Sequence, residues 1–436
     1  KGKQKVKKAS LEELTEGLPY DKRKKHNAYR AYKDGTYYKY ISLDSNNVLE
    51  FIDYFNENRY RVKRENYDPF GNVKRVIYMD IITNTPRQII YYDSLGNPYI
   101  SEWINPETKS TDRIIRFSNK QTVSKVYVND NTSIKVDWLN NFINNIDNGH
   151  VVVVSDTRST DSVLLNLRNS KAIKLWRLHS NHLAPPYKND SKLSPKIKHV
   201  LDNHKELDGV IFLTEEQKKD IEKLYGENKK FKVIPHFHNK KQSLLNCLIP
   251  LKREKTDTKL AVIVSRFSTL KRIEDSIKAF SIVVQQLPDV RLEIWGTGDQ
   301  ENKLEKLIKK LNLTNNVFIK GYTHHPDKIY QRALFSTLTS KSEGFSLSVL
   351  ECMVNKTPMI SYNIKYGPRD MIVDGQNGYL IENGDINALA EKMIFLFKNP
   401  HIAKKMGNSA HKYINKHFNR KIYKEKWLEV INFALK

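Results

Sequence analysis

The chain has 436 residues, of which 39% are hydrophobic, so it is long enough to form two or three domains with buried cores. No apolar run approaches the ~18 residues of a membrane-spanning helix, and with only two cysteines, Cys247 and Cys352, a disulfide framework is excluded and a reducing compartment is favoured. The formal charge of +25 favours a polyanionic partner such as nucleic acid, anionic lipid or an anionic cell-envelope polymer.

The amino-terminal part of the chain changes character near residue 30. Residues 1–30 are polar and rich in lysine, which predicts a mobile basic lead-in or a short helix. Residues 31–125 contain short β-branched and aromatic runs separated by turn sequences such as DPFGN and SLGNP, a pattern typical of an antiparallel meander. Tyrosines alternate with Lys and Arg in these runs, which fits a stacking surface for nucleic acid or packing within half-exposed strands.

Beyond residue 125, apolar runs of strand length alternate with helical segments. One series, from HVVVVSD to FKVIPHF, lies in 126–250, and a second, from LAVIVSRF to GYLIE, lies in 251–436. This rhythm predicts parallel sheets covered on both faces. We therefore expect two α/β domains that meet near residue 250, with the ligand site in the crevice between them.

Two cations follow the first strand of the second series. Arg266 and Lys271 stand in SRFSTLKR at the carboxyl end of that strand, where open α/β sheets bind ligands, and their spacing suits a diphosphate. Gly296, in the GTG that ends the next strand, would let backbone approach a ligand closely. No third glycine completes a dinucleotide-binding pattern there.

The stretch SKSEGFSLSVLECM, residues 340–353, places Glu343 and Glu351 eight positions apart. Leu347, Leu350 and Met353 have helical spacing, which predicts a helix that begins near Ser346. Free N–H groups at a helix start bind anions, so we expect a phosphate to be held there by backbone. The two carboxylates then lie on either side of that anion site and accept hydrogen bonds from hydroxyl groups.

This arrangement resembles the Glu-x7-Glu motif of retaining glycosyltransferases, and residues 255–436 resemble their nucleotide-sugar domain. The fold implied is α/β, of the GT-B type: two Rossmann-like domains with a central crevice, plus an antiparallel β-sheet insertion in the amino-terminal one. The resemblance implies that Arg266 and Lys271 bind the donor diphosphate, that Glu343 binds the hexose and that Glu351 binds the ribose. The rest of the implied donor site is Gly296, Gly344, Phe345, Ser346 and Leu347.

Polar residues after two strands of the first series face the same predicted crevice. In WRLHSNHLAPP, His179 is the best match to a strand-end histidine that the family carries near the donor hexose, with Asn181 and His182 close by. The resemblance thus implies a catalytic set of His179, Arg266, Lys271 and Glu343. Asp156 and Arg158, in VSDTRS, are weaker candidates for the acceptor side.

Within this group, YGPRDMI and the aromatic meander resemble the bacterial poly(polyol-phosphate) α-glycosyltransferases that decorate wall teichoic acid. The resemblance implies transfer of glucose or N-acetylglucosamine from a UDP-sugar to an anionic polyol-phosphate polymer, with no metal, no other cofactor and no nucleic acid partner. A sister family that glycosylates Ser-rich or Ser-Asp repeat adhesins remains an alternative, because such acceptors are also anionic. A non-catalytic nucleic-acid-binding protein explains the charge but not two glutamates beside two cations.

Three further expectations concern the chain as a whole. We expect a cytoplasmic protein with peripheral contact at the inner face of the plasma membrane. Edge strands of the β-sheet insertion predict a homo-oligomer. The family's first strand and glycine-rich loop are missing from residues 1–30 and the chain begins with Lys1, so we expect a sequence truncated before residue 1.

Overall fold

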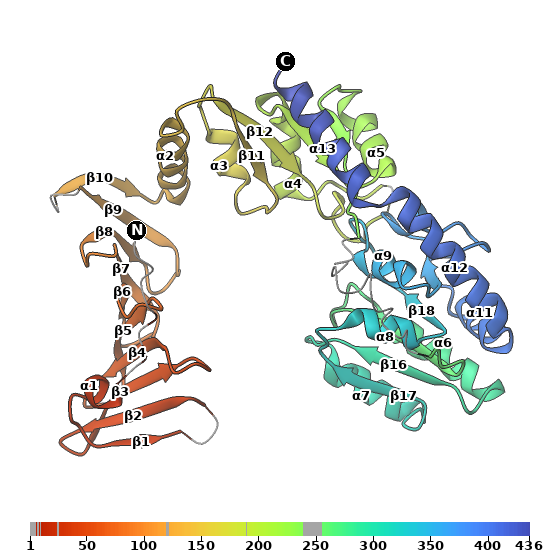
Figure 1. Cartoon of the computed structure of the whole chain (residues 1–436), viewed down its shortest axis with the longest axis horizontal. Coiled ribbons are helices and arrows are strands. Elements are labelled where there is room, and N and C mark those ends of the chain that lie inside the picture. Colours follow the sequence, from red (N-terminus) through yellow and green to blue (C-terminus); the bar gives the residue numbers. More distant parts are fainter. Residues whose placement is uncertain are drawn as a thin grey trace, which may run out of the picture. The chain divides into compact units, whose positions relative to one another are not determined.

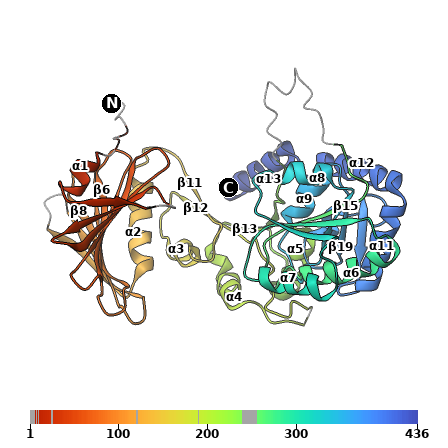
Figure 2. The same cartoon turned by 90° about the horizontal axis from the view of Figure 1, so that it is seen from below.

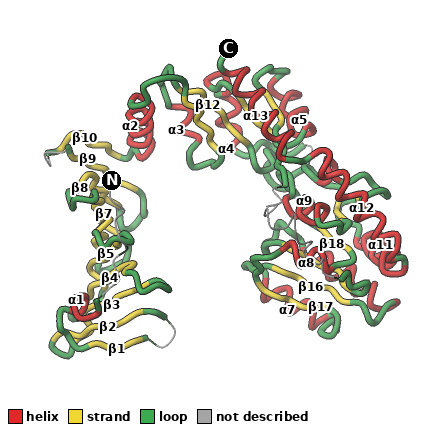
Figure 3. The backbone as a smooth tube through the Cα atoms, in the orientation of Figure 1, coloured by secondary structure: helices red, strands yellow, loops and turns green. Residues whose placement is uncertain are grey.

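The computed structural model describes residues 6, 8, 10–23, 26–118, 122–188, 190–238 and 255–436. They divide into two compact units, Lys1–Asp147 and Asn148–Lys436, each described by itself below (Figure 1). Strands dominate the first unit, whereas helices and strands alternate in the second (Figure 3). Cys247 and the predicted boundary near residue 250 lie outside the described residues. Within the described ranges, no helix is long and apolar enough to cross a membrane.

The first unit contains a ten-stranded antiparallel sheet whose strands follow one another in chain order. Short turns join them, and in several of these an aspartate such as Asp68 or Asp93 accepts backbone N–H groups of the turn. Helix α1 (Leu11–Thr15) packs on a core formed by β3 and β4. The strands are β1 (Tyr20–Lys22), β2 (Ala28–Lys33), β3 (Thr36–Leu43), β4 (Leu49–Phe55), β5 (Arg61–Tyr67), β6 (Val73–Met79), β7 (Pro86–Tyr92), β8 (Pro98–Ile104), β9 (Thr111–Phe117) and β10 (Val123–Val128).

The sheet is longer at both ends than the predicted 31–125. Strand β1 and the start of β2 lie in the segment 1–30, for which we predicted a lead-in, because YDK is too short and polar to show a strand pattern. At the other end, helix α2 (Asn131–Asn144) packs on β10, where Tyr127 donates a hydrogen bond to Asp137 at 2.7 Å. The residues up to Asp147 therefore belong to the β-sheet unit and not to the α/β domain predicted over 126–250.

The second unit begins with a four-stranded parallel sheet. Its strands are β11 (Val151–Ser155), β12 (Ala172–Arg177), β13 (Gly209–Phe212) and β14 (Phe231–Val233). Alternate residues face opposite sides: Trp176 and Phe212 join the core with the helices α3 (Asp161–Asn166), α4 (Pro195–Asp202) and α5 (Glu215–Tyr225). A short 3₁₀ helix, η1 (His204–Glu206), follows α4.

The other face of this sheet is covered from the far end of the chain. Leu175 and Ile211 pack against Val430 of α13 (Arg420–Ala434), with Trp427 beside them (Figure 1). The predicted domain 251–436 thus needs a correction, because its last helix completes the core of the smaller sheet. An uncovered face would expose these apolar side chains to water.

The larger sheet of the second unit is parallel and six-stranded, with the order β17-β16-β15-β18-β19-β20. Alternation along β15 sends Ala261 and Ile263 to one core and Val262 to the other, so both faces are buried as predicted. In Figure 2, α8 and α9 lie on one side of this sheet and α6 and α7 on the other. The strands are β15 (Leu260–Val264), β16 (Arg291–Trp295), β17 (Val317–Gly321), β18 (Phe335–Leu338), β19 (Met359–Tyr362) and β20 (Gly378–Ile381). The helices are α6 (Ile273–Gln286), α7 (Glu301–Lys310), α8 (Pro326–Arg332), α9 (Leu347–Val354), α10 (Pro368–Met371), α11 (Ile386–Lys398) and α12 (Pro400–His417).

Candidate active site

The strand order of the larger sheet reverses between β15 and β18, and ligands of open α/β sheets bind where such a reversal occurs. Residues 265–272 follow β15 and residues 339–346 follow β18. The two loops run side by side, because the Lys341 N–H donates to the Leu270 carbonyl at 2.8 Å. The predicted residues Arg266, Lys271 and Glu343 are therefore carried by neighbouring loops at one edge of the sheet.

Glycines behind the first of these loops allow it to take its position. A Cβ on Gly296 would lie 1.9 Å from the Ser265 carbonyl oxygen, and a Cβ on Gly298 would lie 2.3 Å from that of Phe267. Only glycine permits this approach, at φ angles of 142° and 159°. Gly296 is therefore required for packing under the loop that carries Arg266, and the predicted contact of Gly296 with a ligand remains a prediction.

Helix α9 begins at Leu347, where the sequence predicts a start. Ser346 precedes it in a left-handed conformation, with φ 70° and ψ 78°. No hydrogen-bond acceptor is assigned among the described residues to the backbone N–H groups of Leu347 and Ser348. These groups, at the positive end of the helix, are free to bind the predicted anion.

Histidines from the smaller sheet face this helix start. His179 follows β12, and its Nε2 lies 2.7 Å from Oδ1 of Asp156, which follows β11. Its ring stacks on that of His236 at a centroid distance of 5.3 Å. Burial, assisted by the nearby Arg177 and His179, lowers the pKa of His236 to about 4, so this ring is neutral at pH 7.

These side chains meet in one cavity of about 310 Å³. Within it, Lys271 Nζ lies 2.6 Å from Glu343 Oε1, and the Ser340 hydroxyl donates to the same oxygen at 2.7 Å. All four predicted catalytic residues share this cavity. Its lining consists of His179, Leu213, His236, Val264, Ser265, Arg266, Lys271, Glu343, Gly344, Phe345, Ser346, Leu347 and Ser348. We refer to it as the donor cavity.

Gly344 lies at a contact between the two halves of the second unit, one built on the four-stranded sheet and the other on the six-stranded sheet. A Cβ at this position would lie 1.8 Å from the carbonyl oxygen of His179, which no side chain permits. The next residue, Phe345, is buried, and its ring packs edge-on against His236 and Phe418. Gly344 and Phe345 thus set the spacing between the histidines and the start of α9.

Glu351 lies one turn further into α9 and lines a different cavity, of about 290 Å³. Its neighbours there include Phe237 and Asp327, and burial raises the pKa of its carboxyl group. Leu347 lines both cavities, so Glu343 and Glu351 lie on either side of the helix start. Their roles as hexose and ribose ligands remain predictions.

Arg158, a weaker candidate for the acceptor side, does not line the donor cavity. Its guanidinium lies over the Trp176 ring at 4.5 Å, forms an ion pair with Asp161 at 3.0 Å and donates to the Arg177 carbonyl. Arg158 is half-buried and supports β12. By contrast, Asp156 contacts His179 directly.

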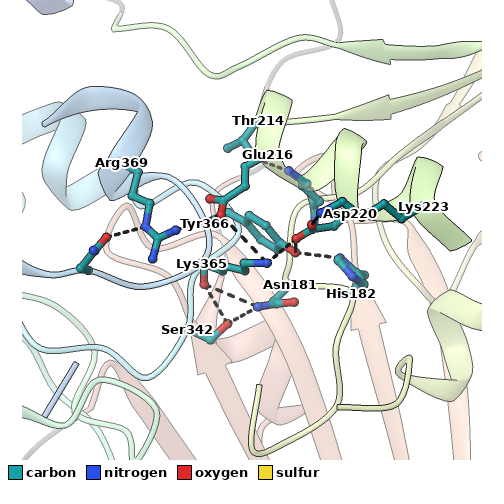
Figure 4. Close-up of polar contacts among 12 residues, drawn as sticks. Asn181, His182, Thr214, Glu216, Asp220, Lys223, Ser342, Lys365, Tyr366 and Arg369 are labelled. Atoms are coloured by element: carbon teal, nitrogen blue, oxygen red, sulfur yellow. Dashed lines mark hydrogen bonds and ion pairs between the residues drawn. The ribbon is translucent and has the colours of Figure 1, made fainter. Parts of the chain in front are cut away.

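Asn181 and His182 belong to a polar contact that joins the two halves of the second unit (Figure 4). Asn181 donates to the Ser342 hydroxyl at 2.7 Å, and the buried His182 ring stacks on that of Tyr366. Burial lowers the pKa of His182 to about 4, so it is a neutral packing partner. The loop of Tyr366 in turn holds Glu343, whose backbone N–H donates to the Lys365 carbonyl and whose carbonyl accepts from Tyr366.

Helix α5 supplies the acidic side of this contact. Lys365 Nζ lies 2.5 Å from Asp220, and Tyr366 donates to the same carboxylate at 2.8 Å (Figure 4). Burial alone would raise the pKa of Asp220, but hydrogen bonds from Lys365 and its neighbours outweigh it and lower the pKa to about 2. Arg369 pairs with Glu216 at 3.0 Å. This contact holds the two halves of the second unit together and, through Tyr366, positions Glu343.

The sequence did not point to His236 or to the α5 contact. His236 follows the apolar run FKVIP, so a search for polar residues after every strand would have found it. Nothing in the sequence separates Asp220 and Glu216 from the other charges of α5. Among the described residues, no three His, Cys, Asp or Glu side chains gather where they would hold a metal ion.

Known proteins resemble this chain over most of its length. Residues 250–413 match the family model "Glycosyl transferases group 1". The poly(glycerol-phosphate) alpha-glucosyltransferase of Bacillus subtilis is 31% identical over 390 residues, which cover 88% of this chain and 56% of that protein. The poly(ribitol-phosphate) alpha-N-acetylglucosaminyltransferase of Staphylococcus aureus is 30% identical over 403 residues, which cover 91% of this chain and 76% of that protein.

The chain therefore belongs to the poly(polyol-phosphate) α-glycosyltransferase family, within the group 1 glycosyltransferases. A crystal structure of TarM superposes on this chain with a TM-score of 0.81 at 28% sequence identity. The superposition covers 97% of this chain and 80% of TarM. The predicted GT-B fold is thereby confirmed. The chain spans just over half of the Bacillus subtilis family member.

Proposed function

We propose that this chain transfers glucose or N-acetylglucosamine from a UDP-sugar to hydroxyl groups of a polyol-phosphate polymer of wall teichoic acid, with retention at the sugar carbon. One observation carries the proposal: Arg266, Lys271 and the free N–H groups of α9 converge in a cavity that also holds Glu343 and His179. Both curated relatives act on polyol-phosphate polymers by name, and a crystal of mutant TarM contained UDP and α-GlcNAc-glycerol.

The cationic side of the donor cavity supports departure of a diphosphate. As the bond from the sugar carbon to the diphosphate breaks, negative charge develops on the diphosphate oxygens, and prearranged cations and amides stabilise it. Lys271 is held in place by Glu343, so little reorganisation is required. Retention follows when the acceptor hydroxyl attacks from the face that the diphosphate leaves and passes its proton to the departing diphosphate oxygen. We propose that no metal or other cofactor is needed.

The proposal also covers location and oligomeric state. We propose that the enzyme is cytoplasmic, lies at the inner face of the plasma membrane and self-associates through its β-sheet unit. Strand β10 ends the sheet with Val126 and Val128 exposed, and the rings of Trp138 and Phe142 stack on an exposed side of α2. Apolar groups at a sheet edge favour association. Sedimentation velocity tests this, and a monomer at micromolar concentration would contradict it.

A transfer assay tests the function directly. UDP-glucose and UDP-N-acetylglucosamine are offered with purified poly(glycerol phosphate), poly(ribitol phosphate) and a Ser-Asp repeat peptide, with chelator in parallel samples. We expect labelled sugar on a polyol phosphate and the α anomer by NMR. Transfer to the peptide alone would refute the proposal, and the loss of activity in chelator would refute its metal independence.

A further inference from the structure

A larger cavity, of about 830 Å³, is lined in part by the same two loops as the donor cavity but contains none of the predicted site residues. Arg272 in its wall follows Lys271, and Lys341 precedes Glu343 by two positions. The paired loops at the sheet edge therefore present alternate residues to the two cavities. We call the larger one the basic cavity.

Cations line the basic cavity, and its lining contains no carboxylate. Three of the five cations are already neutralised: Lys365 pairs with Asp220, Arg369 with Glu216, and Arg272 with Asp275 at 3.0 Å. The remaining two are Lys188, from the smaller-sheet half, and Lys341, from the larger-sheet half.

Lys188 and Lys341 are exposed, and no side-chain partner is assigned to either among the described residues. The backbone N–H of Lys188 donates to the Ser191 hydroxyl at 3.0 Å, and that of Lys341 donates to the Leu270 carbonyl at 2.8 Å. The backbone of both lysines is therefore anchored while their ammonium groups stay available. Two unneutralised positive charges at one cavity attract an anion, and an anion that contacts both would connect the two halves.

Two side-chain amides of the wall add hydrogen-bond donors. The Asn383 amide oxygen accepts a hydrogen bond from Arg272 at 2.7 Å, and the Asn363 amide oxygen accepts one from Arg369. With their oxygens engaged, these amides offer their NH₂ groups, to which no acceptor is assigned within the described chain. A bare sugar requires acceptors as well as donors, whereas a phosphate requires donors alone.

Size and apolar surface indicate which kind of phosphate fits. The cavity is far larger than one phosphate ion, whose share of space is on the order of a few water molecules. Pro185, Leu270 and Ile364 add apolar wall beside the charges. A phosphodiester joined to short carbon chains matches both surfaces, because its charge meets the lysines and its carbons meet the apolar wall.

We propose that the basic cavity binds a backbone phosphodiester of the acceptor polymer, held between Lys188 and Lys341, next to the repeat that receives the sugar. This inference rests on the proposed function and adds the place where the polymer is gripped. Because the charges come from both halves, the polymer also favours the arrangement of the halves that assembles the donor cavity.

The test is the double charge reversal Lys188→Glu/Lys341→Glu. Its matched control is Lys306→Glu/Lys310→Glu, which alters two exposed lysines of α7 and changes the net charge equally. Both are assayed for transfer to poly(glycerol phosphate), poly(ribitol phosphate) and free glycerol. Binding of a fluorescent glycerol-phosphate oligomer is measured in the absence of donor.

We expect the double variant to raise the KM for polymer about tenfold to a hundredfold, as loss of charge-assisted contacts would. The KM for donor and the rate with free glycerol should stay within twofold. Oligomer affinity should fall by the same factor as the polymer KM rises. In a plot of the logarithm of oligomer affinity against the logarithm of salt concentration, the slope should become shallower by about one unit for each lost contact.

Unchanged polymer KM and oligomer affinity would overturn the inference, and so would an equal loss in the control. If the wild type transfers no sugar to any polyol phosphate, the proposed function fails. The inference is then tested by oligomer binding alone. Weaker oligomer binding by the double variant than by the wild type supports the inference, and no oligomer binding by the wild type overturns it. The inference would also be overturned if the double variant lost binding to the Ser-Asp repeat peptide but bound the polymer as the wild type does.

Discussion

Two adjacent cavities at one edge of the six-stranded sheet present opposite kinds of polar surface. The donor cavity contains charges of both signs, since Lys271 is paired with Glu343 and Arg266 lines the same cavity. The basic cavity has donors and cations in its lining and no carboxylate. A site for bond cleavage must orient hydroxyls and stabilise charge in one geometry, which requires acceptors. A site that grips a polyanion requires donors alone.

The largest expected effect comes from the carboxylate that distinguishes the donor cavity. Glu343→Gln removes the charged acceptor that holds Lys271 and is predicted to hold the hexose. We expect kcat to fall by about 10²–10³, the scale for loss of one prearranged polar group at a reacting centre. Steady-state kinetics with saturating polymer provide the measurement, and Glu305→Gln, on an exposed position of α7, is the control. Weaker oligomer binding in Glu343→Gln would show that the two cavities are not separate in function.

A smaller effect is expected on the far side of α9. Glu351→Gln keeps the shape of the side chain but removes a carboxylate that we predict to accept hydrogen bonds from ribose. UDP affinity should fall about tenfold, because hydrogen bonds to charged groups contribute more than neutral ones. Calorimetric titration with UDP measures this, with oligomer binding as the internal reference. A variant that binds UDP as tightly as the wild type would remove ribose recognition from this side chain.

The third effect is on stability, and it concerns the polar contact between the two halves of the second unit. His182 has a pKa of about 4 when folded and about 6.5 when unfolded. Below pH ~6.5 the unfolded chain takes up a proton that the folded chain does not, so stability present above that pH is lost as the pH falls toward 4. His182→Phe keeps a ring against Tyr366 and should abolish this loss, on the order of 3 kcal/mol.

Denaturant unfolding at pH 7 and pH 4.5 provides the comparison for His182. The wild type should lose more free energy of unfolding between these two pH values than His182→Phe does. Equal losses would mean that the ring is protonated in the folded protein, in conflict with its burial. His236 has a similarly lowered pKa and remains in both proteins, so some acid sensitivity persists.

The sequence predicted those parts of the site that one sheet edge carries. Arg266, Lys271 and Glu343 follow apolar strands, and parallel strands bring their carboxyl ends together whatever else the chain does. Helix α9 begins at Leu347 because an apolar spacing of helical period starts there. Alternation likewise predicted the antiparallel sheet, but the three-residue strand β1 was too short to show it.

What the sequence left undetermined depends on contacts between distant segments. The basic cavity exists because Lys188 and Lys341 come from halves that meet where Gly344 approaches the His179 carbonyl. The position of α13 depends on Val430 fitting the face of Leu175 and Ile211. No local pattern encodes such a fit, since any amphipathic helix of that length would have looked the same.

The central claim is that Lys271, Arg266 and the start of α9 bind the diphosphate of the donor. The most direct test is calorimetric titration of UDP into the wild type, Lys271→Met and the surface control Lys306→Met. We predict that Lys271→Met binds UDP about tenfold to a hundredfold more weakly, the range for a lost charge-assisted contact, while the control matches the wild type. Equal affinity in all three proteins would contradict the claim.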